Sequence, residues 1–177
     1  SMYFSPLDEA RISGSYEFIR IFKSFVRLKE TFSAPLVKLS EKITILHAPD
    51  KAFKIYNWEI VRSSSEKRYY GVIQTSQGEI FPLLDISAQD SVFSNSRWYG
   101  NLYYKIISKN LGGQNIYFLF GWNGNSLNSE RKIVDVFGFD SKGKCVFGAP
   151  LFNLIERGKR KTANRLILEY QRGSKVS

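Results

Sequence analysis

Apolar residues recur every three or four positions between residues 8 and 32. Phe18, Phe22 and Phe25 belong to this series, and basic residues fill the positions between them. This spacing gathers apolar side chains on one face of an α-helix. Pro35 marks the expected stop, because the residue before a proline avoids the helical conformation. The pattern predicts one amphipathic helix over residues 8–32.

From about residue 41 the apolar residues follow a spacing of two. In segment 53–61, Phe53 and Ile55 alternate with Tyr56 and Trp58. Alternation is typical of β-strands, whose successive side chains point to opposite faces. Gly, Pro, Asn and Asp residues separate the alternating segments, as expected of turns. The predicted strands cover residues 43–45, 53–61, 69–75, 80–86, 98–107, 115–122, 132–140, 145–152 and 165–171.

Two connections between these strands are longer. Residues 87–96 lack periodicity and are predicted to form a loop or a short helix, and residues 156–161 form a polar, basic linker. Short connections elsewhere favour antiparallel neighbours over parallel βαβ units. We therefore expect a mainly β (α+β) fold in a single domain, with the helix packed on a largely antiparallel β-meander over residues 41–171. A partly closed barrel is an alternative, because many hairpins leave sheet edges to protect.

The same alternation predicts which side chains are buried. These are the apolar residues on the face that each segment turns toward the core: Phe22, Phe25, Ile43, Phe53, Ile55, Val72, Leu83, Tyr103, Ile106, Phe118, Phe120, Ile133, Phe137, Phe147 and Ile167.

The composition fits a soluble globular domain. Aromatic residues make up 15% of the 177 residues, which favours β-structure and argues against disorder. No apolar run reaches the roughly 18 residues of a transmembrane span, and the start lacks the pattern of a signal peptide. Cys145 is the only cysteine, so no disulfide can form within the chain.

The sequence has one histidine and one cysteine, which leaves little room for catalysis or metal binding by these residues. His47 is the only histidine, so every Ser-His or Cys-His arrangement would need it, and its place before Pro49 indicates the end of a strand. One histidine and one cysteine cannot form the usual zinc site. We therefore expect no metal and no cofactor, and we favour a protein that is not an enzyme.

Carboxylates could still catalyse hydrolysis without histidine, as they do in glycosidases. Asp85 and Asp135 lie among apolar neighbours, where burial would raise their pKa values, and Glu59 is a third candidate. Each could equally form a structural ion pair.

Aromatic residues and amides are the most suggestive candidates for ligand binding. On strands, one ring of each pair Tyr69-Tyr70, Trp98-Tyr99 and Tyr103-Tyr104 should be buried and the other directed outward. Asn-Gly in the Trp122–Asn125 segment is typical of a turn, but a tryptophan beside two amides could also hold a sugar. The candidate ligand-binding residues are Tyr56, Trp58, Trp98, Tyr99, Trp122, Asn123 and Asn125.

The net charge of +10 is concentrated near the end of the sequence. Residues 154–177 hold seven basic and two acidic residues, a local charge of +5. Arg157, Lys159, Arg160 and Lys161 are candidates for contact with anions. A solvated loop is the simpler interpretation, and the absence of aromatic residues between these charges argues against nucleic acid as the partner.

Four blocks of the sequence resemble an uncharacterised family of exported proteins from bacteria of the Bacteroidetes phylum. The blocks are residues 50–59 (DKAFKIYNWE), 98–107 (WYGNLYYKII), 119–125 (LFGWNGN) and 146–152 (VFGAPLF). The resemblance spans roughly residues 45–172 and implies a periplasmic or secreted location. It supplies no activity and no catalytic residues.

Three functional hypotheses follow. The first is a non-catalytic, envelope-associated binding module for a glycan or another envelope component. The second is a hydrolase with paired carboxylates roughly 5–10 Å apart in one pocket. The third is a binder of anionic polymers, which requires that residues 157–172 form one continuous positive face.

Overall fold

Helices occupy the beginning of the computed structural model, which describes residues 6–62, 66–86 and 92–174. Helix α1 spans Pro6–Phe25, and the short helices α2 (Glu30–Ser33) and α3 (Val37–Ser40) follow. The predicted helix over residues 8–32 is therefore interrupted after Phe25. There, Gln74 Nε2 donates a 3.0 Å hydrogen bond to the carbonyl of Val26, and Lys54 Nζ donates one of 2.8 Å to the carbonyl of Thr31. Side chains of the sheet beneath thus donate hydrogen bonds to backbone carbonyls near the end of the helix.

The first sheet is an antiparallel meander of four consecutive strands. They are β1 (Thr44–His47), β2 (Phe53–Val61), β3 (Lys67–Thr75) and β4 (Ile80–Leu84), in the order β1-β2-β3-β4. Strand β1 is short: its pairing with β2 begins at Thr44 opposite Asn57. The second half of β2 therefore has a strand neighbour only on the β3 side.

The second sheet is built around β7 (Ser129–Phe139). Strands β5 (Leu102–Leu111) and β6 (Gln114–Asn123) lie on one side of it, and β11 (Arg165–Gln171) and β8 (Cys145–Phe147) pair with its other edge. The return of β11 to β7 departs from a simple meander. Strand β5 also begins later than the predicted residue 98, because Trp98 instead forms an isolated parallel bridge with Asp85.

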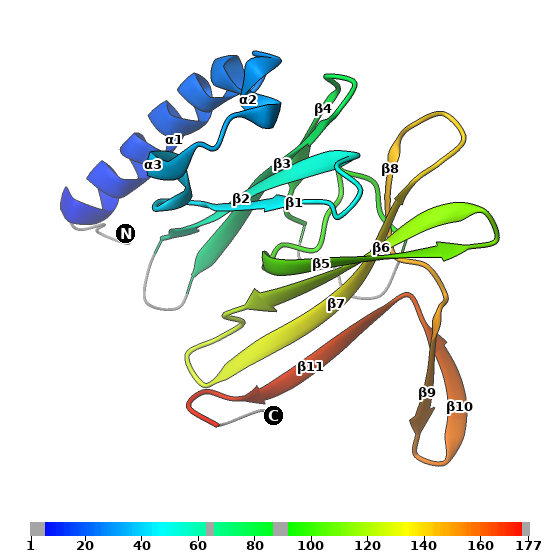
Figure 1. Cartoon of the computed structure of the whole chain (residues 1–177). Coiled ribbons are helices and arrows are strands. Elements are labelled where there is room, and N and C mark those ends of the chain that lie inside the picture. Colours follow the sequence, from blue (N-terminus) through cyan, green and yellow to red (C-terminus); the bar gives the residue numbers. More distant parts are fainter. Residues whose placement is uncertain (1–5, 63–65, 87–91, 175–177) are drawn as a thin grey trace.

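A hairpin replaces the linker predicted at residues 156–161. Its strands are β9 (Phe152–Glu156) and β10 (Lys159–Ala163), and Arg157 and Gly158 connect them with positive φ angles of 50° and 77°. Two consecutive positive φ angles suit a tight hairpin turn. Figure 1 shows this hairpin pointing away from the two large sheets.

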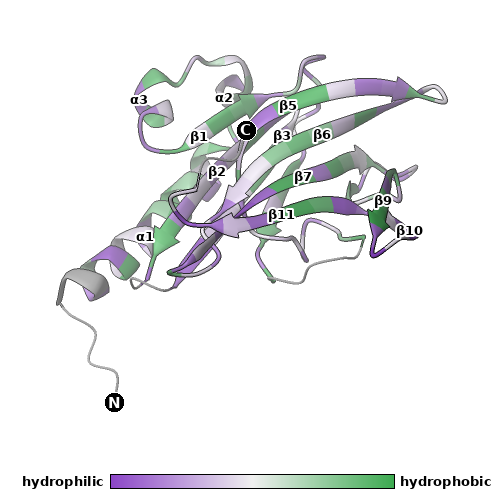
Figure 2. Cartoon of the chain, turned by 90° about the horizontal axis from the view of Figure 1, so that it is seen from below, coloured by the Kyte–Doolittle hydropathy of each residue, from purple (hydrophilic) through white to green (hydrophobic). Residues whose placement is uncertain are grey.

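The molecule has three layers: α1, the first sheet and the second sheet (Figure 1). Phe22 and Val26 of the helical layer pack against Tyr56, Trp58 and Val72 on the outer face of the first sheet. No helix lies in front of β5, β6, β7 and β11 in the view of Figure 2. These antiparallel sheets with few helices confirm the α+β, mainly β prediction, and the described strands form two large sheets and the small β9–β10 sheet without closing into a barrel.

The larger core lies between the sheets and contains Phe53, Ile55, Leu119, Phe137 and Phe147, each 0% exposed. Most residues predicted to be buried are buried. The exceptions are only partly buried and lie at the rim of a core or on the outer face of the second sheet: Phe25, Ile106, Phe118, Phe120 and Ile167. No described helix is long and apolar enough to span a membrane.

Candidate functional site

A polar recess of about 430 Å³ lies where the start of β3 meets the end of β6. Its volume is within the range of small-molecule sites. It contains four of the residues singled out in the sequence: Asp85, Tyr99, Asn123 and Asn125. We call it the polar recess, and its full lining is Glu66, Lys67, Arg68, Tyr69, Asp85, Tyr99, Asn123, Gly124, Asn125 and Arg131.

Two tyrosine hydroxyls are fixed in the polar recess by donors from the second sheet. Tyr69, at the start of β3, accepts a 2.8 Å hydrogen bond from the backbone N–H of Gly124. Tyr99 accepts a 3.1 Å hydrogen bond from Arg131 Nη1. Since a hydroxyl can donate one hydrogen bond while it accepts others, both tyrosines keep a proton that a ligand could use.

Asp85 is held at the recess by the backbone of the segment that precedes β5. Its Oδ1 accepts a 3.1 Å hydrogen bond from the N–H of Gly100. A Cβ atom at position 100 would overlap the Asp85 carboxylate, so glycine allows this close approach. The side-chain amide of Asn123 donates to the carbonyl of the same Gly100. Gly100 therefore fixes both an acid and an amide of the polar recess.

Asn125 and Arg131 share an acceptor on β11. Asn125 Nδ2 lies 3.0 Å from Glu169 Oε1, and Arg131 Nη2 lies 2.9 Å from Glu169 Oε2. The hydrogen bonds from Ser129 and Arg131 keep the pKa of Glu169 below its ordinary value. Glu169 thus stays ionised and holds the donors on this side of the recess in place.

Trp122 lies next to the polar recess. Lys67 Nζ sits 4.7 Å from the centre of its ring and also contacts the Glu59 carboxylate at 3.2 Å. A Cβ atom at Gly124 would come within 2.9 Å of the same ring. The sequence-predicted Trp122 and Glu59 are therefore placed beside the recess, with Glu59 engaged by a lysine.

Burial raises the pKa of Tyr69 well above its ordinary value, and the nearby charges of Glu59 and Asp85 add to this effect. The hydroxyl therefore remains protonated over the physiological pH range. Its chemistry in the polar recess is hydrogen bonding.

Three sequence-predicted aromatic residues lie elsewhere. Tyr56 and Trp98 are 0% exposed and do not line the polar recess. Trp58 lines a different cavity between α1 and β2. The doublet prediction holds for Tyr103 and Tyr104, of which the second is 52% exposed, but Trp98 and Tyr99 are both buried because they precede the strand.

Asp135 is fully buried between the sheets and forms an ion pair with Arg165, with 3.2 Å between Oδ1 and Nε. Tyr103 donates a 3.1 Å hydrogen bond to the other carboxylate oxygen. Burial raises the pKa of Asp135, and the charge of Arg165 opposes that shift. Asp135 does not line the polar recess, so the structure does not bring it together with Asp85 in one pocket.

The basic residues Arg157, Lys159, Arg160 and Lys161 surround the turn of the β9–β10 hairpin and are all exposed. Arg165 is only 3% exposed. The continuous positive face expected over residues 157–172 therefore does not form, because its central arginine is turned into the core.

Sequence reasoning did not assign Arg131 to the site, and it noted Tyr69 only as half of an aromatic doublet. Both residues join the polar recess through long-range packing, which local periodicity does not reveal. Among the described residues, no cluster of His, Cys, Asp and Glu side chains is arranged to hold a metal ion.

Comparison of the chain with protein-family models, with curated proteins and with solved structures found no match.

Proposed function

We propose that this protein is a non-catalytic binding module whose polar recess holds a sugar or a similar polyhydroxylated ligand. The observation that carries the proposal is the convergence of Asp85, Tyr99, Asn123 and Asn125 in one recess. Asp85, Tyr99 and the Asn123–Asn125 segment come from three separate parts of the chain, and local turn formation does not account for their meeting.

The chemistry of the recess suits hydroxyl groups. A sugar hydroxyl both donates and accepts hydrogen bonds, and the recess offers an acid, two amides and two tyrosine hydroxyls. Its cations have acidic partners: Lys67 pairs with Glu59, and Arg131 pairs with Glu169. Neutralised cations favour a neutral ligand over a strongly anionic one.

The resemblance to exported proteins of Bacteroidetes bacteria supports a periplasmic or secreted location. We therefore propose a glycan of the cell envelope as the ligand class.

A panel of soluble mono- and oligosaccharides, screened by thermal shift and followed by calorimetry, tests this function. A ligand that prefers the native state raises the melting temperature. Asp85→Asn should weaken binding of the best sugar about tenfold, because a hydrogen bond to a charged group contributes roughly 1.5–3 kcal/mol. Glu156→Gln, which removes a carboxylate on the distant hairpin, should leave the affinity unchanged.

The same samples distinguish binding from hydrolysis. A hydrolase would shorten the oligosaccharide, and Asp85→Asn would abolish that cleavage. Binding without cleavage supports the module. Equal affinity of wild type and Asp85→Asn for every sugar in the panel would refute the assignment of the polar recess.

The continuous positive face over residues 157–172 does not form, so a second candidate, the binding of an anionic polymer, rests on the hairpin turn alone. Four exposed cations gather there against one acid, Glu156, whose Oε2 lies 3.6 Å from Lys161 Nζ. Heparin affinity that falls steeply with added salt, and that is lost when Arg157 and Arg160 are changed to Gln, would support it.

A further inference from the structure

The second half of β2 is a sheet edge with unpaired backbone groups. The carbonyl of Phe53 accepts a hydrogen bond from Ala48 on the β1 side. Alternate residues of a strand face the same neighbour, so Glu59 and Val61 also turn their N–H and C=O groups to that side. The β1 ladder stops at Asn57, and no described residue forms a backbone hydrogen bond with Glu59 or Val61 there. Two donors and two acceptors are thus available in strand geometry.

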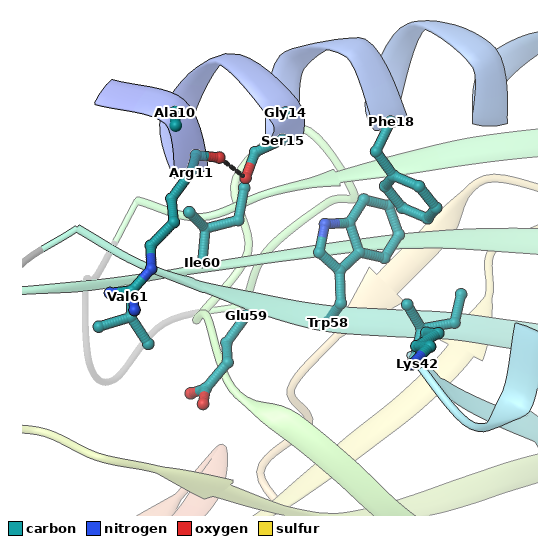
Figure 3. Close-up of a pocket in the computed structure, with 11 residues that line it drawn as sticks. Ala10, Arg11, Gly14, Ser15, Phe18, Lys42, Trp58, Glu59, Ile60 and Val61 are labelled. Carbon is teal, nitrogen blue, oxygen red and sulfur yellow. Dashed lines mark hydrogen bonds between the residues drawn. The ribbon is translucent and has the colours of Figure 1, made fainter. Parts of the chain in front are cut away.

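Two cavities flank this edge. On the helix side, a recess of about 550 Å³ lies between α1 and β2, and Phe18, Trp58 and Ile60 form its apolar wall (Figure 3). A second cavity of about 540 Å³ extends around the open edge from Trp58 to Glu59 and Leu102. An added strand directs alternate side chains to opposite faces, and the two cavities leave room for side chains beside this edge.

Trp58 supplies a second, independent observation. Trp58 is only 9% exposed, and its indole Nε1 has no hydrogen-bond partner among the described residues. Figure 3 shows this nitrogen on the Ile60 side of the ring, within the helix-side recess. Buried donors without a partner are rare and unfavourable. An oxygen atom of a bound segment would satisfy it.

The charge on the helix side defines the partner. Arg11 extends from α1 toward Val61, and Lys42 lies at the other end of the recess (Figure 3). Glu59 lines the same recess, but its carboxylate is paired with Lys67 at 3.2 Å. At Gly14, nothing lies within 4 Å of where a Cβ would stand, which keeps the helix wall open. The positive charge of Lys42 therefore favours a carboxylate in the recess.

We propose that the β2 edge at Glu59–Val61 binds an extended, acidic peptide segment of a partner protein by strand addition. The backbone of the peptide would pair with Glu59 and Val61. Its apolar and acidic side chains would enter the helix-side recess, where a carbonyl or carboxylate oxygen accepts the Trp58 N–H. This mode gives affinity through main-chain hydrogen bonds and specificity through alternate pockets.

Selection from a displayed library of random octapeptides tests the proposal, with Val61→Pro as the counter-selection and Val61→Ala as the matched control. Proline removes the N–H that faces the open edge and leaves the β3 ladder intact, which edge strands tolerate. Enriched peptides should be acidic with alternating apolar residues. Their affinity should fall at least tenfold for Val61→Pro and less than threefold for Val61→Ala.

Hydrogen exchange locates the bound peptide. An enriched peptide should slow exchange of the Glu59 and Val61 amides at least tenfold, and Lys42→Gln should weaken peptide binding severalfold. Enrichment that is equal on Val61→Pro, protection at other amides, or a preference for basic peptides would overturn the proposal. So would a wild-type dimer that Val61→Pro dissociates, because the edge would then belong to a second copy. Sugar binding in the polar recess should be the same in Val61→Pro, which keeps the two tests separate.

Discussion

Two buried charged centres are stabilised in different ways. Between the sheets, Asp135 meets the opposite charge of Arg165, and Tyr103 completes the carboxylate's hydrogen bonds. Beneath the helices, Lys54 is 0% exposed and forms no ion pair with any acid that the structure describes: its Nζ lies 2.8 Å, 3.3 Å and 3.5 Å from the carbonyls of Thr31, Phe32 and Ala34. One centre joins strands to each other, and the other joins a helical segment to a sheet.

Beneath the helices a buried charge supplies a donor to backbone carbonyls, whereas between the sheets two buried charges balance each other. The second sheet satisfies its backbone through its own ladders, so the Asp135–Arg165 pair must balance itself. The α2 segment ends after four residues and leaves carbonyls without helical partners, and Lys54 supplies the missing donor. The polar layer around it continues through Gln74, which donates to Thr31 Oγ1 at 3.0 Å.

Breaking the charge pair should produce the largest effect. Asp135→Ala leaves Arg165 buried without its acid and should lower the free energy of unfolding by about 3–5 kcal/mol. Chemical denaturation measures this loss. The double variant Asp135→Leu with Arg165→Met should recover most of the stability, and failure to recover it would show that the pair does more than balance charge.

Removing the buried charge of Lys54 should have a smaller effect on the free energy of unfolding. Lys54→Met keeps the apolar stem but deprives three carbonyls of a donor, so we expect a loss of about 1–3 kcal/mol in unfolding free energy. Lys38→Met on exposed α3 should cost little and serves as the control. Hydrogen exchange should also show earlier opening of residues 26–34 in Lys54→Met. Equal stability of the two variants would contradict the role assigned to Lys54.

The smallest effect is a shift in a single titration. Partial desolvation at the end of β1 lowers the pKa of His47 below its ordinary 6.5, and the charges of Lys54 and Lys51 lower it further. The unfolded chain therefore binds a proton near pH 6.5 before the native state does, so this histidine makes stability fall as pH drops below 6.5. Because His47 is the only histidine, NMR should show its pKa rising in Lys54→Met. An unchanged value would mean that Lys54 carries no charge at neutral pH.

Alternation of apolar and polar residues predicts strand limits correctly where one face of the strand packs on a core. Segments 53–61 and 165–171 were predicted with the limits that β2 and β11 have, because their apolar residues face a core on one side. The helix was predicted too long because the bond from Gln74 to Val26 spans 48 residues and leaves no local signal. The hairpin was read as a linker because its strands are polar and largely exposed.

The sequence pointed to several residues of the candidate site by their chemical type, but it did not predict that they meet in one recess. Tryptophan beside amides pointed to Asn123 and Asn125, and the aromatic doublet pointed to Tyr99. Their meeting with Asp85 depends on Gly100, whose N–H and C=O contact Asp85 and Asn123 respectively. Spacing in the sequence could not specify that contact, since Asp85 and Gly100 lie on either side of residues 87–96, which lack periodicity.

The position of β11 along the opposite edge of β7 sets an order of events during translation. Asp135 emerges from the ribosome 30 residues before the arginine that neutralises it. At about 5–20 residues per second, this separation corresponds to roughly 2–6 s. During that interval the nascent second sheet lacks a strand and its acid lacks a counter-ion, so the sheet should close only after β11 has been synthesised.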